Sequence, residues 1–179
     1  MRIAVISDIH GNLAALDEVL ADIKRRGCDA TVNLGDCCAG PLWPRETFER
    51  LEALGLPTVR GNHDRHAGDP PASWGVALQS DPFTLGPFAC LHEPADSATP
   101  ATSDAGAPIA IELSGHLHPA FRLTTSRESV ALPCFWRHHR GVVLPSFGSF
   151  TGSSPVPLDI GESAIVVAGQ HLHHLMRRG

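Results

Sequence analysis

The sequence lacks the features that mark membrane proteins and proteins that bind long nucleic acids. No apolar run approaches the roughly 20 residues that a membrane-spanning helix needs, so no membrane partner is expected. Lys and Arg together number 14 against 19 acidic residues, and the formal net charge of -5 leaves no broad basic field for long nucleic acid. A nucleic acid that is short, or held mainly by metal, stays compatible with this balance.

Paired thiols are also missing. The five cysteines are odd in number and form no CxxC motif. We expect buried, reduced thiols, because three of the five lie in or beside apolar runs. Cys37 and Cys38 directly follow Gly35-Asp36, which leaves a thiol near a functional site as the alternative.

The composition that is present is typical of a globular protein. Of the 179 residues, 42% are hydrophobic and 18% are charged. This length predicts a single domain over residues 1–179. The apolar start of the chain is short and runs straight into Asp8, which does not fit a signal peptide. We therefore predict a cytoplasmic protein.

The first third of the chain alternates between strands and helices. Short apolar runs are typical of strands that are covered on both faces. Asn12 can cap the first helix, and Gly27 and Gly55 can end the two helices. The predicted order is strand 3–6, helix 13–26, strand 30–34, helix 44–54 and strand 57–60.

The rest of the chain predicts strands with little helix. Residues 66–75 are predicted to form a connector and residues 93–108 a mobile loop, because both are rich in small and turn-forming residues. The predicted strands are 76–79, 83–85, 88–91, 109–113, 121–124, 130–135, 142–144, 164–167 and 171–175. A helix-rich front half and a strand-rich back half, joined as two sheets, are therefore expected.

Five polar clusters each follow a predicted strand, and strand ends bring side chains to a common site. Apart from His63 and Asp64, they supply two Asp, one Asn and four His as candidate ligands, in a chain that has 11 histidines and no tyrosine. This excess of histidine favours metal chemistry. The clusters are Ser7-Asp8-Ile9-His10, Gly35-Asp36, Gly61-Asn62-His63-Asp64, His92-Glu93-Pro94 and Gly115-His116-Leu117-His118.

This mixture of ligands suits a pair of divalent ions. Two ions about 3.5–4 Å apart need about this number of ligands and share one carboxylate. Imidazole and amide ligands are neutral, so the remaining positive charge can polarise a phosphoryl group and acidify a water molecule between the ions. The sequence thus predicts phosphate-ester chemistry without a Ser or Cys nucleophile.

The order and composition of the five clusters resemble the calcineurin-like metallophosphoesterases from residue 3 to about residue 119. The resemblance implies a four-layer α-β-β-α sandwich of two mixed sheets, an α/β fold. It implies that Asp36 bridges the two metal ions. It implies a first metal held by Asp8, His10 and His118, and a second held by Asn62, His92 and His116. Many relatives have Gly after the histidine of the fourth cluster, where this chain has Glu93.

The same resemblance implies a mechanism. A metal-bridging hydroxide attacks phosphorus in line, and His63 assists the leaving oxygen, an effect of perhaps 10²–10⁴-fold for general-acid help. Asp64 would orient His63. Asn62, Arg60 and Arg65 are the candidate substrate-binding residues. Arg60, Arg65 and Arg137 are the candidates for binding a second phosphate group of the substrate.

The two halves resemble different branches of the family. Residues 1–65 look like small bacterial phosphodiesterases of the YfcE type, and the chain from Trp74 onward looks like the DNA-ligase-associated metallophosphoesterases known as PdeM. This mosaic raises the hypothesis of a hybrid joined near residues 65–74. In the stretch 145–152, Phe147 and Phe150 either plug the core between the sheets or form a wall on which a base or aryl group stacks.

We therefore predict a binuclear-metal-dependent phosphoesterase, in the first place a phosphodiesterase acting on small nucleotide-like or aryl diesters. The alternatives are a phosphomonoesterase or nucleotide hydrolase, a DNA endonuclease with DNA as partner, and, more remotely, a non-catalytic metal-binding scaffold. Manganese is the first expectation for the two divalent ions, and Fe, Zn, Co and Ni are alternatives. A homodimer is the candidate assembly.

Overall fold

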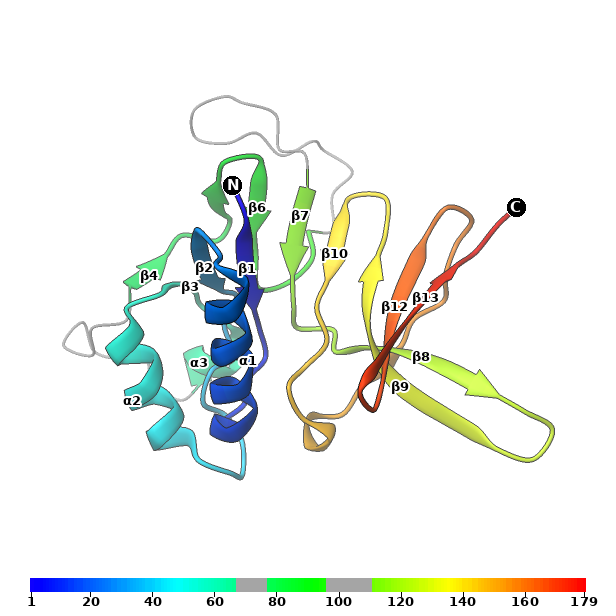
Figure 1. The fold of residues 1–179 in the computed structure, drawn as a ribbon, viewed down its shortest axis with the longest axis horizontal. Helices are drawn as coiled ribbons and strands as arrows, with labels where there is room; N and C mark the ends of the chain where they lie inside the picture. Colours follow the sequence, from blue (N-terminus) through cyan, green and yellow to red (C-terminus); the bar gives the residue numbers. More distant parts are fainter. Residues whose placement is uncertain (67–76, 96–110) are drawn as a thin grey trace.

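The structure is a computed structural model, and it describes residues 1–66, 77–95 and 111–179. Most of the predicted connector 66–75 and of the predicted loop 93–108 lies outside the described residues. Figure 1 shows the described chain as two β-sheets, with the two long helices on the side of the N-terminal sheet.

The first sheet is built by the front of the chain. Its strands are parallel and follow the order β1-β2-β3-β4. They are β1 (Ile3–Ile6), β2 (Ala30–Asn33), β3 (Pro57–Val59) and β4 (Ala77–Gln79). Because parallel strands end at the same edge, the loops after β1, β2 and β3 meet there.

Two helices connect these strands, α1 (Leu13–Arg26) and α2 (Pro44–Leu54). Asn12 caps α1, because its side-chain oxygen accepts the backbone N–H of Ala15 at 3.3 Å. Gly27 ends α1 with a left-handed φ of 63°, a conformation that glycine adopts without steric cost. Leu16 of α1 and Leu51 of α2 are buried in one cluster with Ile6, Ile9 and Cys37, which seats both helices against the sheet.

The second sheet has nine strands. Seven of them follow the order β11-β8-β9-β10-β7-β6-β5, and β12 pairs with β9 and with the edge strand β13. The strands are β5 (Phe83–Leu85), β6 (Phe88–Cys90), β7 (Ile111–Ser114), β8 (Pro119–Thr124), β9 (Ser129–Arg137), β10 (Gly141–Val143), β11 (Ser154–Pro155), β12 (Ser163–Ala168) and β13 (His171–Met176).

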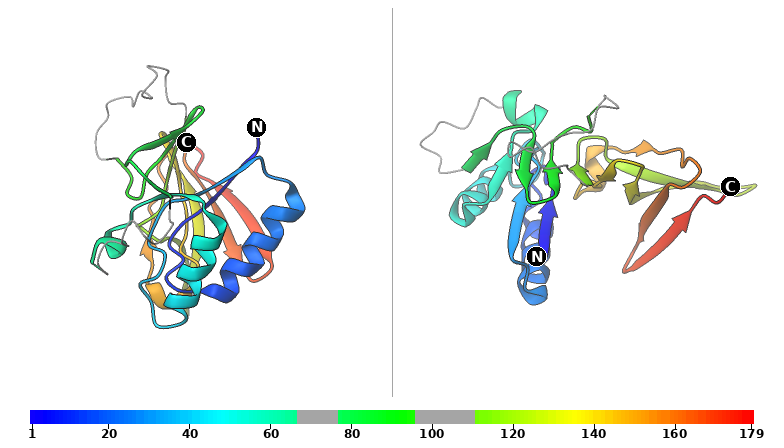
Figure 2. Two further views of the ribbon diagram at one scale, coloured as in Figure 1. Left: turned by 90° about the vertical axis from the view of Figure 1, so that its left-hand side faces the viewer. Right: turned by 90° about the horizontal axis from the view of Figure 1, so that it is seen from above.

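An apolar core joins the two sheets. Val32 and Val59 of the first sheet share a buried cluster with Cys90 and Leu144 of the second. A separate cluster around Cys134 packs β9 against β12. Figure 2 shows that β8, β9, β12 and β13 extend away from the helices, so this end of the second sheet lies beyond the cover of the first.

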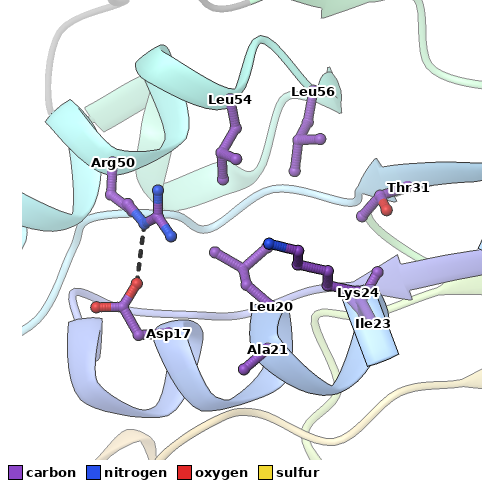
Figure 3. A pocket seen from close by; sticks show the side chains of 9 residues that line it. All are labelled: Asp17, Leu20, Ala21, Ile23, Lys24, Thr31, Arg50, Leu54 and Leu56. Carbon is purple, nitrogen blue, oxygen red and sulfur yellow. Dashed lines mark hydrogen bonds and ion pairs between the residues drawn. The ribbon is translucent and has the colours of Figure 1, made fainter. Parts of the chain in front are cut away.

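A crevice of about 630 Å³ lies between α1 and α2 (Figure 3). Leu20, Leu54 and Leu56 give it an apolar wall, and the Asp17–Arg50 ion pair of 2.9 Å spans it. None of its lining residues belongs to the five polar clusters. We therefore look for the functional site elsewhere, at the strand ends.

The predicted class, a mixed α/β fold with two sheets and a strand-rich back half, is confirmed. The two long helices lie where they were predicted. Two details of the expected four-layer sandwich differ within the described residues: the first sheet is parallel throughout rather than mixed, and no long helix follows Leu54 to cover the second sheet. Several strand ends also shift; the strand predicted at 130–135 is Ser129–Arg137, and the segment after β3 contains the short helix α3 (Asn62–His66). Hydrophobic runs mark strand interiors, whereas pairing with neighbours decides where a strand ends.

None of the helices in residues 1–66, 77–95 and 111–179 is long and apolar enough to span a membrane.

Candidate metal centre

The five polar clusters meet at one edge of the two sheets, and three of them contain left-handed turns. Among the described residues, the non-glycine positions with positive φ are Asp8 (55°), His10 (51°), Asp36 (54°), His116 (65°) and His118 (46°). All five are predicted metal ligands. Left-handed backbone costs free energy in residues with a Cβ, so such strain at one site points to function rather than to packing.

The first group of ligand atoms comes from Asp8, His10 and His118, and these atoms lie within 4.8 Å of one another. The Nε2 atom of His118 is 3.2 Å from Oδ1 of Asp8 and 3.4 Å from Nε2 of His10. Asp8 and His10 are buried. The other oxygen of Asp8, Oδ2, accepts the Ser7 hydroxyl at 2.7 Å and the backbone N–H of His116 at 3.0 Å, which leaves Oδ1 facing the group.

The second group contains Asp36, His92 and His116, also within 4.8 Å. Asn62 completes it: its Oδ1 atom lies 2.9 Å from Nε2 of His92 and 2.9 Å from Nδ1 of His116. His92 and Asp36 are buried, whereas the side chain of His116 is 29% exposed. The four residues are thus close enough to share one ion.

Asp36 lies between the two groups. Its Oδ2 atom is 3.8 Å from Nε2 of His10 in the first group and 3.5 Å from Nε2 of His92 in the second. Its Oδ1 atom accepts the backbone N–H of His63 at 3.0 Å. The carboxylate therefore presents one oxygen to both groups, which is the geometry that a bridging ligand requires.

The histidine hydrogen bonds show that these groups fit cations. The Nδ1 atoms of His10, His92 and His118 face the carbonyl oxygens of Ala39 (2.7 Å), Leu34 (2.8 Å) and Thr151 (3.3 Å). A carbonyl oxygen only accepts, so each Nδ1 carries the proton and each neutral ring turns the lone pair of Nε2 toward the group. Acceptor atoms as close as 2.9–3.4 Å repel one another without a positive charge between them, and a divalent cation supplies it.

Two side chains of the first group, His118 and Asp8, have shifted pKa values in the metal-free protein. Burial disfavours the charged form of His118, but the hydrogen bond and the charge of Asp8 outweigh it and raise the pKa of His118 above its ordinary value. Burial likewise opposes ionisation of Asp8, and the bonds from His118 and Ser7 outweigh it, so the pKa of Asp8 is lowered. A cation and a proton therefore compete for the Nε2 atom of His118.

Asp64 supports the loops that carry these ligands. Its Oδ2 atom accepts the backbone N–H groups of Asp36 (2.8 Å) and Gly61 (3.0 Å), and its Oδ1 atom accepts that of Cys37 (3.0 Å). The hydrogen bonds of Asp64 among the described residues all run to backbone, and none runs to the ring of His63. The predicted orientation of His63 by Asp64 stays a prediction, and the backbone support was missed because no sequence pattern marks it.

Gly61 lets this loop approach Asp36 closely. A Cβ atom at position 61 would lie 2.0 Å from Oδ1 of Asp36 and 2.4 Å from its backbone nitrogen. We expect Gly61→Ala to lower the free energy of unfolding by roughly 1–3 kcal/mol and to weaken metal binding, measured by thermal unfolding and by metal titration. Gly55→Ala is the control, because no atom lies within 4 Å of a Cβ there. It should cost roughly 1 kcal/mol for its left-handed φ with metal binding unchanged; equal metal binding in both variants would contradict the prediction.

The other predicted site residues fall into different surroundings. His63 is exposed, and its ring centroid lies 5.5 Å from that of His10. Arg60 is half-buried, and the side chain of Arg65 lies outside the described part of the chain. Arg137 is exposed on β9.

The two phenylalanines of the stretch 145–152 have different surroundings. Phe147 packs against the cluster of Ile6, Ile9 and Leu16 and also lines a concavity beside His118, so it belongs to the core and to a pocket wall at once. Phe150 lies in the short helix η2 (Ser149–Thr151), is 40% exposed, and places its ring where a Cβ of Gly148 would be. The exposed ring of Phe150 therefore keeps the other alternative, a wall on which a base or aryl group of a substrate stacks.

The five cysteines are free, and Cys37, Cys90 and Cys134 are buried as predicted, whereas Cys28 and Cys38 are only partly buried. Burial raises the pKa of Cys37 well above its usual range, that of Cys38 to about 12, and those of Cys90 and Cys134 to about 11. These thiols are protonated at neutral pH, so the alternative of a reactive thiol beside Asp36 finds no support.

Comparison with known proteins agrees with this site. The sequence model of the calcineurin-like phosphoesterases matches residues 1–97. A crystal structure of a Pseudomonas putida nuclease, MPE, is 31% identical, with 97% of this chain and 87% of that chain covered and a TM-score of 0.64. The chain thus belongs to the calcineurin-like phosphoesterases, a family of metal-dependent phosphoester hydrolases.

Two further relatives are more distant or more partial. The Escherichia coli phosphoesterase YfcE has the same fold, with 21% identity, 98% of each chain covered and a TM-score of 0.57. An uncharacterized protein of Methanocaldococcus jannaschii is 50% identical over 62 residues, which are 35% of this chain and 26% of that protein. This chain therefore matches about a quarter of the length of that relative.

Proposed function

We propose that the protein is a phosphodiesterase that uses two divalent ions, with manganese as the first candidate, on small nucleotide-like or aryl diesters. The position of Asp36 Oδ2 between the two ligand groups carries the two-ion part of the proposal. When bound, such a pair of ions activates water and neutralises charge on the phosphoryl group. The mixed nitrogen and oxygen donors suit Mn, and also Fe, Zn, Co or Ni.

The protein's own side chains then have distinct roles. Asn62 and the four histidines hold the ions, and Asp64 holds the backbone beneath Asp36. His63 is exposed, beside His10 but outside both ligand groups. This position supports the role that we propose for its imidazole, which is to give a proton to the leaving oxygen and to recover one from solvent.

A neighbouring pocket supports a diester rather than a monoester. A concavity of about 240 Å³ lies against His118. Pro119, Pro133 and Phe147 make part of its wall apolar, Ser146 and Ser149 add hydroxyl groups, and His118 is its one titratable lining residue. A diester carries a second organic group in place of a charged oxygen, and a pocket without acidic lining residues against the ligand His118 suits such a group.

A substrate panel tests this proposal. With manganese added, we expect faster hydrolysis of bis(para-nitrophenyl) phosphate than of para-nitrophenyl phosphate, measured as kcat/KM. Ala131 also lines the pocket, and Ala131→Phe should raise KM for the diester roughly tenfold, the scale of losing a well-packed contact, with kcat for the monoester unchanged. Faster monoester hydrolysis would sink the diester proposal, and inactivity with metals bound would favour the non-catalytic scaffold.

DNA cleavage is the second candidate. The nuclease of Pseudomonas putida is 31% identical, and the β8–β9 ribbon begins directly after His118 and extends outward (Figure 1). Residues 119–137 carry three arginines against one glutamate in an otherwise acidic chain. Nicking of supercoiled plasmid, added to the same panel, would support this candidate if it exceeded dinucleotide hydrolysis at equal enzyme concentration.

A further inference from the structure

His116 is turned the opposite way from the other three histidines of the centre. His10, His92 and His118 direct Nδ1 to a backbone carbonyl and Nε2 to the ligand groups. In His116 it is Nδ1 that faces the group, 2.9 Å from Oδ1 of Asn62. Its Nε2 atom therefore points out of the centre, and a ligating Nδ1 needs the proton to be on Nε2.

The side chain of Glu93 lies next to the Nε2 atom of His116. The Oε1 atom of Glu93 lies 3.7 Å from Nε2 of His116. Glu93 directly follows the ligand His92, and its side chain is 69% exposed. A carboxylate only accepts hydrogen bonds, and a small rotation of this exposed side chain closes 3.7 Å to hydrogen-bond distance.

We propose that Glu93 is a positioning residue for the second metal ion: its carboxylate accepts the Nε2–H of His116 and thereby holds the ring with Nδ1 toward Asn62 and Asp36. The inference rests on the proposed two-ion function. Glu93 is not a ligand in this arrangement, because it lies on the side of the His116 ring opposite to Nδ1. Carboxylates behind ligating histidines fix the orientation of the ring and raise its basicity.

The arrangement makes the two groups unequal. The rings of the first group are held by backbone carbonyls, which no side-chain substitution removes. In the second group, His92 is held in the same way, whereas His116 depends on an exposed glutamate. The second ion is therefore the one whose affinity Glu93 controls.

Metal titration of the 179-residue chain tests the inference, with Mn²⁺ and Zn²⁺ as probes and calorimetry as the readout. We expect Glu93→Ala to weaken the second binding step by about 10–100-fold, the usual effect of losing such a partner, with the first step unchanged. Glu93→Gln keeps an acceptor oxygen without the charge and should fall between Glu93→Ala and the parent. Glu18→Ala, an exposed glutamate of α1, is the control for the lost charge.

A spectroscopic measurement separates positioning from general damage. In the Zn²⁺-loaded parent, the Nε2–H proton of His116 should be visible by ¹H–¹⁵N NMR and protected from exchange, and Glu93→Ala should remove this protection. Equal second-step affinity in Glu93→Ala and Glu18→Ala would overturn the inference while leaving the two-ion site intact. A parent protein that binds one ion only would overturn both.

Discussion

We expect His63→Ala to lower kcat by about 10²–10⁴-fold, the range of general-acid catalysis, for a diester with an alkyl leaving group, and to leave the metal content unchanged. The reason is geometric: the ring of His63 is exposed beside His10, and neither ligand group includes it. Its backbone N–H, which Oδ1 of Asp36 accepts at 3.0 Å, survives the substitution. Steady-state kinetics and metal analysis of the same preparation check both parts.

An exposed histidine away from the centre supplies the control. His139 lies in the exposed turn after β9, and His139→Ala should keep full activity. A leaving group that needs no proton, such as para-nitrophenolate, should suffer less from His63→Ala than an alkyl leaving group does. If His63→Ala lost much of its metal, His63 would be a ligand and the proposed role would fail.

Asp36→Asn is expected to have a comparably large effect through the metals themselves. The buried carboxylate presents Oδ2 to both ligand groups, and a neutral amide cannot hold two cations through one oxygen. We expect the variant to bind fewer than two ions and kcat/KM to fall by at least about 10²-fold, since groups that act as a unit fail together.

Stability measurements distinguish this effect from unfolding. The amide of Asn keeps the size of the side chain and an acceptor for the His63 N–H, so the metal-free variant should unfold at or above the temperature of the metal-free parent. Asp159→Asn, at an exposed carboxylate beyond the centre, is the matched control and should bind two ions. If Asp36→Asn still bound two ions, the proposal that Asp36 bridges them would be wrong.

Much of the centre could be predicted because strand ends converge. Asp8, Asp36 and Asn62 follow β1, β2 and β3, which are parallel, so their loops meet at one edge whatever the details of packing. The histidines of the second sheet arrive in the same way, after β6 and β7. The predicted roles of the individual residues, the single domain, the cytoplasmic location, the homodimer and the hybrid origin stay predictions.

Other features could not be predicted because they depend on contacts between distant segments. Asp64 bonds to backbone groups that lie 27 and 28 residues away, and a carboxylate in a sequence carries no mark of which N–H it will meet. The orientation of His116 likewise depends on Glu93 and Asn62, which approach it from two other loops.

The sequence by itself determined which donor atoms are available and that they follow strands, because apolar runs and polar clusters are local properties of the chain. Only the tertiary structure decided how those donors face one another: the left-handed turns at five ligands, the oxygen of Asp36 shared between two groups, and the choice of ring nitrogen in each histidine. These are matters of angle and distance between segments far apart in the chain, which folding alone sets.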